Sequence, residues 1–189
     1  MNYHNILHDD MRNGTGLRVT LFLSGCNHYC HNCQNPQTWD CSGGIEFDLA
    51  AKEEIFEQLE KDYIHGITFS GGDPLHQNNI DGVIKLCEEI KNNFPNKTIW
   101  IYTGYYWEEI FEPTFTYQSK EWSYDFLKHN EVRKQIIAMC DVLVDGRYVE
   151  SLSDIKYHWA GSTNQSVIDV KKSLEIGEIV LWETNANTN

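Results

Sequence analysis

Three cysteines, Cys26, Cys30 and Cys33, follow an apolar segment directly, in a C-x3-C-x2-C spacing. Thiolates bind zinc, copper(I) and iron–sulfur clusters, so this spacing indicates a metal centre. A structural zinc normally has four protein ligands, whereas three thiols leave one iron of a cubane cluster without a protein ligand. Such an iron can bind a substrate directly. The spacing therefore favours an iron–sulfur cluster that takes part in chemistry.

A zinc site is the alternative that this spacing leaves open. His28, His31 and Cys41 lie near the three thiols in the sequence, and any one of them would complete a four-ligand zinc site. The chain would then be a zinc-stabilised binding module without catalysis. The motifs further along the chain have to decide between the two.

The composition predicts one globular domain over residues 1–189. Hydrophobic residues are 41% and aromatic residues 13% of the chain, enough apolar surface for a core. The formal net charge of -13 would repel a phosphate backbone, so we expect no direct contact with nucleic acid. The longest apolar runs are too short to cross a bilayer, and the N-terminus lacks a signal-peptide pattern. We therefore expect a cytoplasmic protein, with its thiols reduced.

The hydrophobic pattern predicts alternating strands and helices. Strands are expected at residues 17–23, 67–69, 98–102, 142–144, 165–170 and 179–182, and helices at 48–63, 80–90, 107–111 and 131–139. Residues 1–16 are polar and are expected to end in a flexible turn, while the aromatic-rich stretch 105–127 is either a surface elaboration or a partner-facing surface. The alternation predicts an α/β fold, in which a parallel sheet curls into a partial (βα) barrel with helices outside and a mouth formed by the loops that follow the strands.

Three loops come together at this mouth: the cysteine loop, the Ser70-Gly71-Gly72-Asp73-Pro74 turn and the Asp145-Gly146-Arg147 segment. Taken alone, the glycine turn is an ordinary strand-to-helix turn and the third loop a surface ion pair. Taken together, they suit a ligand with an amino-acid end and a positive centre. Its amino and carboxylate groups would chelate the open iron, and the backbone of the two glycines would receive the ammonium. S-adenosylmethionine is such a ligand.

These motifs resemble the radical S-adenosylmethionine superfamily, and more closely the activating proteins of anaerobic (class III) ribonucleotide reductases. Besides the thiols, the resemblance depends on four segments at residues 13–18, 70–75, 144–148 and 161–169. The Asp-Gly-Arg-Tyr and Gly-Ser-x-Asn-Gln sequences in the last two are the family-specific parts. The resemblance covers residues 3–170 and implies a barrel of the radical S-adenosylmethionine type.

The resemblance also implies a function. The three thiols would hold a [4Fe-4S] cluster with S-adenosylmethionine on the fourth iron, and a flavodoxin-type or similar protein would supply the electron. Cleavage of S-adenosylmethionine would give a 5′-deoxyadenosyl radical, which would take a hydrogen from a glycine of the reductase catalytic subunit. A homodimer is possible. The alternatives are activation of another glycyl-radical enzyme or a small-molecule reaction, and the Asp-Gly-Arg-Tyr segment counts against both.

Individual roles follow from the resemblance, position by position. The cofactor-binding residues it implies are Gly71 and Gly72 at the methionyl amino group, Asp73 orienting the turn or taking a hydrogen bond, Asn32 and Gln34 near the adenine, Thr103 near the ribose or carboxylate, and also Cys33 and Ser70. Asp145 and Arg147 take the places of a catalytic acid and base that contact the cofactor or the glycine loop. Two positions depart from the superfamily pattern. Asn32 replaces a common aromatic residue before the third cysteine, and Asp73 replaces the commoner glutamate.

Overall fold

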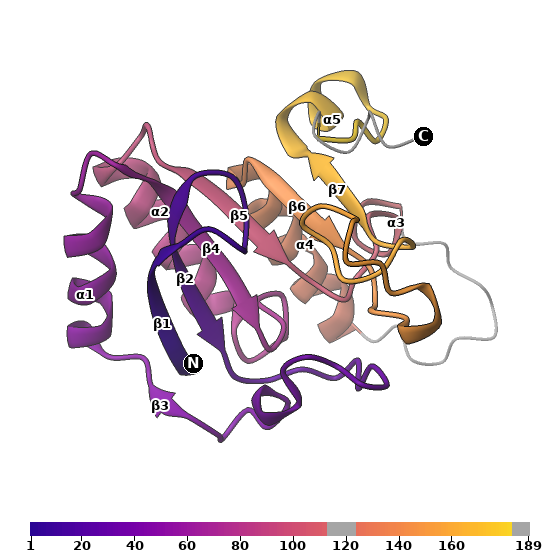
Figure 1. Cartoon of the computed structure of the whole chain (residues 1–189), viewed down its shortest axis with the longest axis horizontal. Coiled ribbons are helices and arrows are strands. Elements are labelled where there is room, and N and C mark those ends of the chain that lie inside the picture. Colours follow the sequence, from indigo (N-terminus) through magenta and orange to yellow (C-terminus); the bar gives the residue numbers. More distant parts are fainter. Residues whose placement is uncertain (113–123, 183–189) are drawn as a thin grey trace.

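The computed structural model describes the backbone of residues 1–112 and 124–182, with the side chains of 124–127 left aside. Within these residues, seven strands form one sheet in the order β3-β1-β2-β4-β5-β6-β7 (Figure 1). The strands are β1 (Asn2–Asp10), β2 (Leu17–Leu23), β3 (Ile45–Glu46), β4 (Ile64–Gly71), β5 (Thr98–Tyr102), β6 (Val142–Asp145) and β7 (Ser166–Asp169).

Helices connect the central strands. They are α1 (Leu49–Leu59), α2 (Ile80–Asn93), α3 (Trp107–Phe111), α4 (Tyr124–Met139) and α5 (Val170–Ile176), with short 3-10 turns η1 (Pro36–Thr38) and η2 (Glu150–Leu152). Successive strands β2, β4, β5 and β6 are added in one direction, so right-handed crossovers put α1, α2 and α4 on the same face. Figure 1 shows α2 and α4 behind the strands, and α2 packs against α4.

The parallel sheet predicted from the sequence is confirmed at the centre and wrong at the edges. β2, β4, β5 and β6 pair in parallel, and most of their residues are buried, the majority of these apolar, as expected for a sheet whose centre is covered. β1 and β3 on one side and β7 on the other are antiparallel. The strand pairing establishes a mixed α/β sheet, and the partial barrel stays a prediction.

The N-terminal segment is the largest error in the predicted elements. Residues 1–16 were expected to be polar chain ending in a flexible turn, but β1 pairs along β2 from Tyr3 to Asp10. The strand was not recognised because most of its side chains are partly or fully exposed to solvent, so it has no continuous apolar run. Only Tyr3 and Ile6 pack against the core from this strand, while Asp10 is buried and accepts a hydrogen bond from the Thr20 hydroxyl at 2.8 Å.

The C-terminal segment also differs from the prediction. Asp169 caps α5 by accepting from the backbone of Lys172, and Gly177 ends it in a left-handed conformation with φ 81°. The capping aspartate and the terminating glycine are both visible in the sequence. The helix was not predicted because it is only seven residues long. Residues 179–182 were expected to be a strand, and they make a single bridge between Leu181 and Ile168.

The other predicted elements are confirmed with shifted ends. Asp48 is the N-cap of α1 and accepts from the backbone of Ala51 at 2.9 Å. That helix ends at Leu59, before the predicted residue 63, because β4 already begins at Ile64. α3 has the predicted bounds, and α4 begins before its predicted start. The stretch 105–127 was expected to be either a surface elaboration or a partner-facing surface, and residues 113–123 of that stretch lie outside the described residues.

Candidate cluster and cofactor site

The carboxyl ends of the four parallel strands meet at one edge of the sheet, where α/β proteins bind ligands. The cysteine loop follows β2, the glycine turn follows β4, Thr103 and Gly104 follow β5, and residues 146–148 follow β6. All four loops line one cavity of about 120 Å³. Its lining includes all three clustered thiols together with Ser70, Gly71, Gly72, Asp73 and Thr103. The topology thus assembles most of the residues that the sequence singled out.

Each thiol sulfur in this cavity faces a backbone amide. Cys26 accepts from the amide of His28 and Cys30 from the amide of Tyr148. The amide of Asn35 lies 3.4 Å from the sulfur of Cys33. Hydrogen bonds of this kind stabilise negative charge on sulfur and are one of the levers that set the reduction potential of an iron–sulfur cluster. The chain therefore directs backbone dipoles at the atoms that would bind metal.

The geometry of the three thiols fits a cluster. All three are free, half-buried thiols. Among residues 1–112 and 124–182, no three His, Cys, Asp or Glu side chains come close enough together to hold a single metal ion. The observation that fits a cluster is that Cys26, Cys30 and Cys33 line the same cavity, since thiolates are the usual ligands of iron–sulfur clusters. Burial raises the pKa of Cys26 to about 12 and also raises that of Cys30, so metal has to displace protons when it binds.

Gly71 and Gly72 allow the turn after β4 to lie directly on the end of β2. A Cβ on Gly72 would lie 2.6 Å from the carbonyl oxygen of Gly25, and Gly71 has φ 91° with the backbone of Leu23 2.9 Å from a Cβ position. The sequence suggested that absent side chains admit a ligand. The structure shows that they admit the chain's own backbone. The amide of Gly72 donates to the carbonyl of Leu23 at 2.8 Å. A ligand ammonium is itself a donor, so carbonyl oxygens of the turn are the groups that would receive it.

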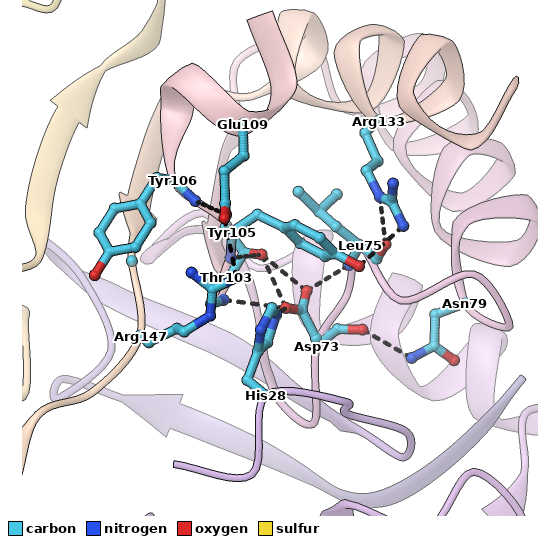
Figure 2. Close-up of polar contacts among 12 residues, drawn as sticks. His28, Asp73, Leu75, Asn79, Thr103, Tyr105, Tyr106, Glu109, Arg133 and Arg147 are labelled. Atoms are coloured by element: carbon cyan, nitrogen blue, oxygen red, sulfur yellow. Dashed lines mark hydrogen bonds and ion pairs between the residues drawn. The ribbon is translucent and has the colours of Figure 1, made fainter. Parts of the chain in front are cut away.

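Asp73 is the buried centre of the site (Figure 2). Its carboxylate accepts from the amide of Leu75 at 2.8 Å, the hydroxyl of Thr103 at 2.9 Å, the amide of Gly104 at 3.0 Å and Nε2 of His28 at 2.6 Å. Burial alone would raise the pKa of Asp73, but these donors outweigh it and hold the pKa below its usual value.

These contacts restrict what Asp73 can do for a ligand. A carboxylate has about four lone-pair sites, and four donor groups already point at them. Asp73 therefore has no acceptor capacity left for a ligand amine. It acts on the site by fixing the glycine turn, the cysteine loop and the end of β5 relative to one another. Thr103 is engaged as well, since its hydroxyl donates to Asp73 and accepts from the amide of Tyr105.

A second cavity adjoins the first along the side of Cys33. It shares Cys33, Ser70 and Tyr102 with the first cavity and adds Gln34 and Asn35. Gln34 therefore lines a cavity that has Cys33 in its wall, and its predicted place near the adenine stays a proposal. The two adjoining cavities, one with Asp73 and both with Cys33 in their walls, are together called the longer cleft.

Asn32 lies outside this cleft. It is exposed, has a positive φ of 54°, and donates to Glu150 at 2.6 Å. His31 contacts the other oxygen of Glu150 at 3.0 Å. The structure thus ties Asn32 to η2 and leaves its predicted contact with adenine a proposal.

Asp145 and Arg147 do not line either cavity. Asp145 is buried, and its two oxygens accept from the backbone amides of Trp107 and Ser166. Burial raises the pKa of Asp145 despite these donors. Arg147 lies over the ring of Tyr106 and pairs with Glu109 at 3.0 Å. The family-specific segment reaches the cavity through Gly146 and Tyr148 instead.

Sequence reasoning missed three residues that shape the cavity: His28, Tyr148 and Gln165. Gln165 donates to the carbonyl of Gly146 at 2.8 Å and accepts from the amide of Gly161 at 2.9 Å, which joins two loops at the mouth. Tyr148 and Gln165 belong to the segments that carried the resemblance. His28 was considered only as a zinc ligand, and nothing in the sequence linked it to Asp73.

Comparison with known proteins agrees with this site. Residues 12–168, which contain all three thiols, match the family model of a 4Fe-4S single cluster domain. The anaerobic ribonucleoside-triphosphate reductase-activating protein of Escherichia coli (strain K12) is 38% identical over 169 residues, which cover 88% of this chain and 97% of the relative. The chain belongs to the family of these activating proteins.

Other members of the family are similarly close. The activating protein of Haemophilus influenzae is 33% identical over 88% of this chain and 97% of the relative. That of Enterobacteria phage T4 is 38% identical over 87% of this chain and 92% of the relative. The resemblance inferred from the sequence is thus confirmed, and the matched domain makes an iron–sulfur cluster the cofactor of this chain. Among the described helices, none has the length and apolar character needed to cross a membrane.

Proposed function

We propose that this chain cleaves S-adenosylmethionine reductively and uses the 5′-deoxyadenosyl radical to take a hydrogen atom from a glycine of an anaerobic ribonucleotide reductase, leaving a glycyl radical there. The names of the family members support the reductase as the partner. The observation that carries the proposal is the convergence of three thiols, each facing a backbone amide, with the glycine turn on one cavity.

The roles of the residues follow from that geometry. Cys26, Cys30 and Cys33 would hold a [4Fe-4S] cluster. When bound, the cluster supplies one electron to the sulfonium of S-adenosylmethionine, which separates into methionine and the radical. Carbonyl groups of the turn at Gly71 and Gly72 would receive the methionyl ammonium, and Asp73 keeps the turn in place.

The longer cleft suits the rest of the cofactor. Ser70 and Gln34 line the second cavity beside Cys33, which supports Gln34 near the adenine and Ser70 as a further contact with the cofactor. Asn32, Thr103, Asp145 and Arg147 are retained as proposed site residues. Arg147 is 38% exposed near the mouth, so contact with the glycine loop of the reductase is the role that suits it best. We also propose that residues 1–189 act as one domain, that the sheet curls as a partial barrel, and that a flavodoxin-type protein in the cytoplasm is the reductant.

Anaerobic reconstitution tests this proposal. The chain is loaded with iron and sulfide, reduced with dithionite in the presence of S-adenosylmethionine, and assayed for 5′-deoxyadenosine. We expect the parent and Cys41→Ala to form the nucleoside and Cys30→Ala to form none, because Cys41 does not line the cavity. Addition of the reductase should then give a glycyl radical signal. An iron-loaded parent that forms no nucleoside would contradict the proposal, and a colourless zinc protein would favour the binding module.

A further inference from the structure

His28 stands between two of the thiols in sequence, but its side chain is directed at the glycine turn. Figure 2 shows it rising from the cysteine loop toward the carboxylate of Asp73. We propose that His28 is a positioning residue, which locks the cysteine loop to the glycine turn through Asp73 and so fixes the thiols relative to the place where S-adenosylmethionine binds. This inference rests on the proposed function and adds to it the residue that aligns the two halves of the site.

The contact between His28 and Asp73 is short and sheltered. Nε2 of His28 lies 2.6 Å from Oδ2 of Asp73, and the two side chains are 8% and 2% exposed. A hydrogen bond between buried groups, one of them charged, is stronger than one at the surface. It joins residues that are 45 positions apart in the sequence. The hydrogen bond therefore connects two loops that are not neighbours along the chain.

The surroundings of the His28 ring leave it little freedom. The ring of Tyr105 lies edge-on to it at 4.8 Å between centroids. On another side is Gly104, where a Cβ would lie 2.3 Å from the imidazole. The absence of a side chain at position 104 therefore makes room for His28. The ring is held by packing as well as by its hydrogen bond.

The backbone of His28 contacts the other half of the site. Its amide faces the sulfur of Cys26 and lowers the pKa of that thiol against the effect of burial. One residue thus touches a thiol with its amide and the glycine turn with its ring. Any movement of His28 displaces both contacts together.

Asp73 transmits this constraint to the turn. Its own amide donates to the carbonyl of Gly25 at 2.7 Å, immediately before the first thiol. The side-chain amide of Asn79 bridges the carbonyls of Ser24 and Asp73 at 2.8 and 2.9 Å. These bonds secure the beginning of the cysteine loop, whereas His28 secures a point farther along it. The loop is therefore fixed at two points on one turn.

His31 offers a matched control in the same loop. It is next to Cys30 in sequence, as close to the thiols as His28, but its side chain is 84% exposed and contacts the exposed Glu150. Exposed pairs of this kind contribute little to stability. Truncation of His31 therefore removes a histidine side chain as close to the thiols as that of His28. It should leave the glycine turn undisturbed.

The first test is amide hydrogen exchange on the full chain without metal. In His28→Ala we expect the amides of Leu75 and Gly104, which donate to Asp73, and those of residues 26–33 to exchange about tenfold faster or more than in the parent. His31→Ala should match the parent at Leu75 and Gly104. His28→Gln keeps an N–H donor at a similar reach and should recover part of the protection. Unchanged exchange in His28→Ala would overturn the inference.

The second test uses the reconstituted chain and the spectrum of its reduced cluster. We expect His28→Ala to bind iron within about twofold of the parent but to need about tenfold more S-adenosylmethionine for half of the spectral change, a factor that corresponds to 1.4 kcal/mol. His28→Gln should lie between the two. If His28→Ala folds but binds no iron, His28 belongs to the metal site itself and the positioning role is wrong. An unchanged requirement for S-adenosylmethionine would also overturn it.

The two tests separate this inference from the proposed function. A parent whose reduced cluster does not respond to S-adenosylmethionine would contradict the proposed function. Hydrogen exchange on the metal-free chain would still decide whether His28 joins the two loops.

Discussion

The guanidinium of Arg18 lies over the ring of Trp100, 5.3 Å from its centroid, and both side chains are almost completely buried, at 0% and 1% exposure. Arg18 also donates to the hydroxyls of Thr68 and Thr98 at 2.8 and 2.9 Å, and to three backbone carbonyl groups. Burial lowers the pKa of Arg18 to about 10, so the group is still charged at pH 7. It joins β2, β4 and β5 at the end of the sheet away from the thiols.

We expect Arg18→Met to destabilise the chain by about 3 kcal/mol or more. The substitution keeps much of the apolar stem but leaves buried carbonyl and hydroxyl groups without donors. Urea unfolding of the metal-free chain measures the effect. Arg12→Met is the control, because the Arg12 side chain is 83% exposed and should change stability by no more than about 0.5 kcal/mol. Equal effects of the two substitutions would contradict the role given to Arg18.

Gly72→Ala should disturb the cysteine loop. Its Cβ would lie 2.6 Å from the carbonyl oxygen of Gly25, and backbone has to move to relieve a contact that short. Overpacking of this kind costs roughly 1–3 kcal/mol, and the displaced atom is next to the first thiol. Iron content after reconstitution should fall. Gly43→Ala, at a partly buried glycine whose Cβ would lie 3.2 Å from the carbonyl oxygen of Asp40, should retain the iron of the parent.

Asp73 should make stability depend on pH in the acid range. Its folded-state pKa lies below the ordinary value of 3.8, so the ionised form favours folding. That contribution is complete above about pH 4 to 5 and is lost as the pH falls through the folded pKa. Asp73→Asn should therefore be less stable than the parent by about 2–3 kcal/mol at pH 7, and the difference should shrink below pH 4. Asp62→Asn, at an exposed position, should give no such difference.

Cluster assembly should become faster as the pH rises. Burial raises the pKa of Cys26 to about 12, so the thiol is protonated at pH 7 and the thiolate fraction grows about tenfold for each pH unit. If deprotonation of Cys26 limits assembly, we expect the rate of assembly from iron and sulfide to increase by about thirtyfold between pH 7 and pH 8.5. Absorbance of the cluster under anaerobic conditions measures it. A rate independent of pH would show that deprotonation of the buried thiol does not limit assembly.

The sequence predicted the parts of this molecule that depend on local pattern. The apolar run at residues 17–23, the N-cap at Asp48 and the glycine turn after β4 are each written in a few consecutive residues. β1 was not predicted because β3 covers only its first residues and most of its side chains are partly or fully solvated, so it has no apolar run. α5 escaped because a seven-residue helix gives too little periodicity to stand out from its neighbours.

The site was predictable as far as its motifs reach. The three thiols and the two glycines do line one cavity, because parallel strands bring the loops after them to one edge. The network around Asp73 was not predictable, since it depends on contacts from His28 and Thr103, which lie 45 and 30 positions away. The direction of a side chain beside a family motif was equally hidden. Asp145 accepts from backbone amides of α3 and β7, while Tyr148 lines the cavity that contains the thiols.

The amides that face the three sulfurs have a consequence for how this chain can change over evolutionary time. A side-chain donor disappears with a single codon change, but every residue other than proline brings a backbone N–H. Positions 35 and 148 can therefore exchange their side chains while the local field at sulfur is preserved, as long as the loop keeps its path. At position 28 the amide is equally general, but the path of the loop depends on the His28 ring. The backbone N–H groups thus protect the electronic setting of the metal centre from point mutation, because only a substitution by proline removes such a group.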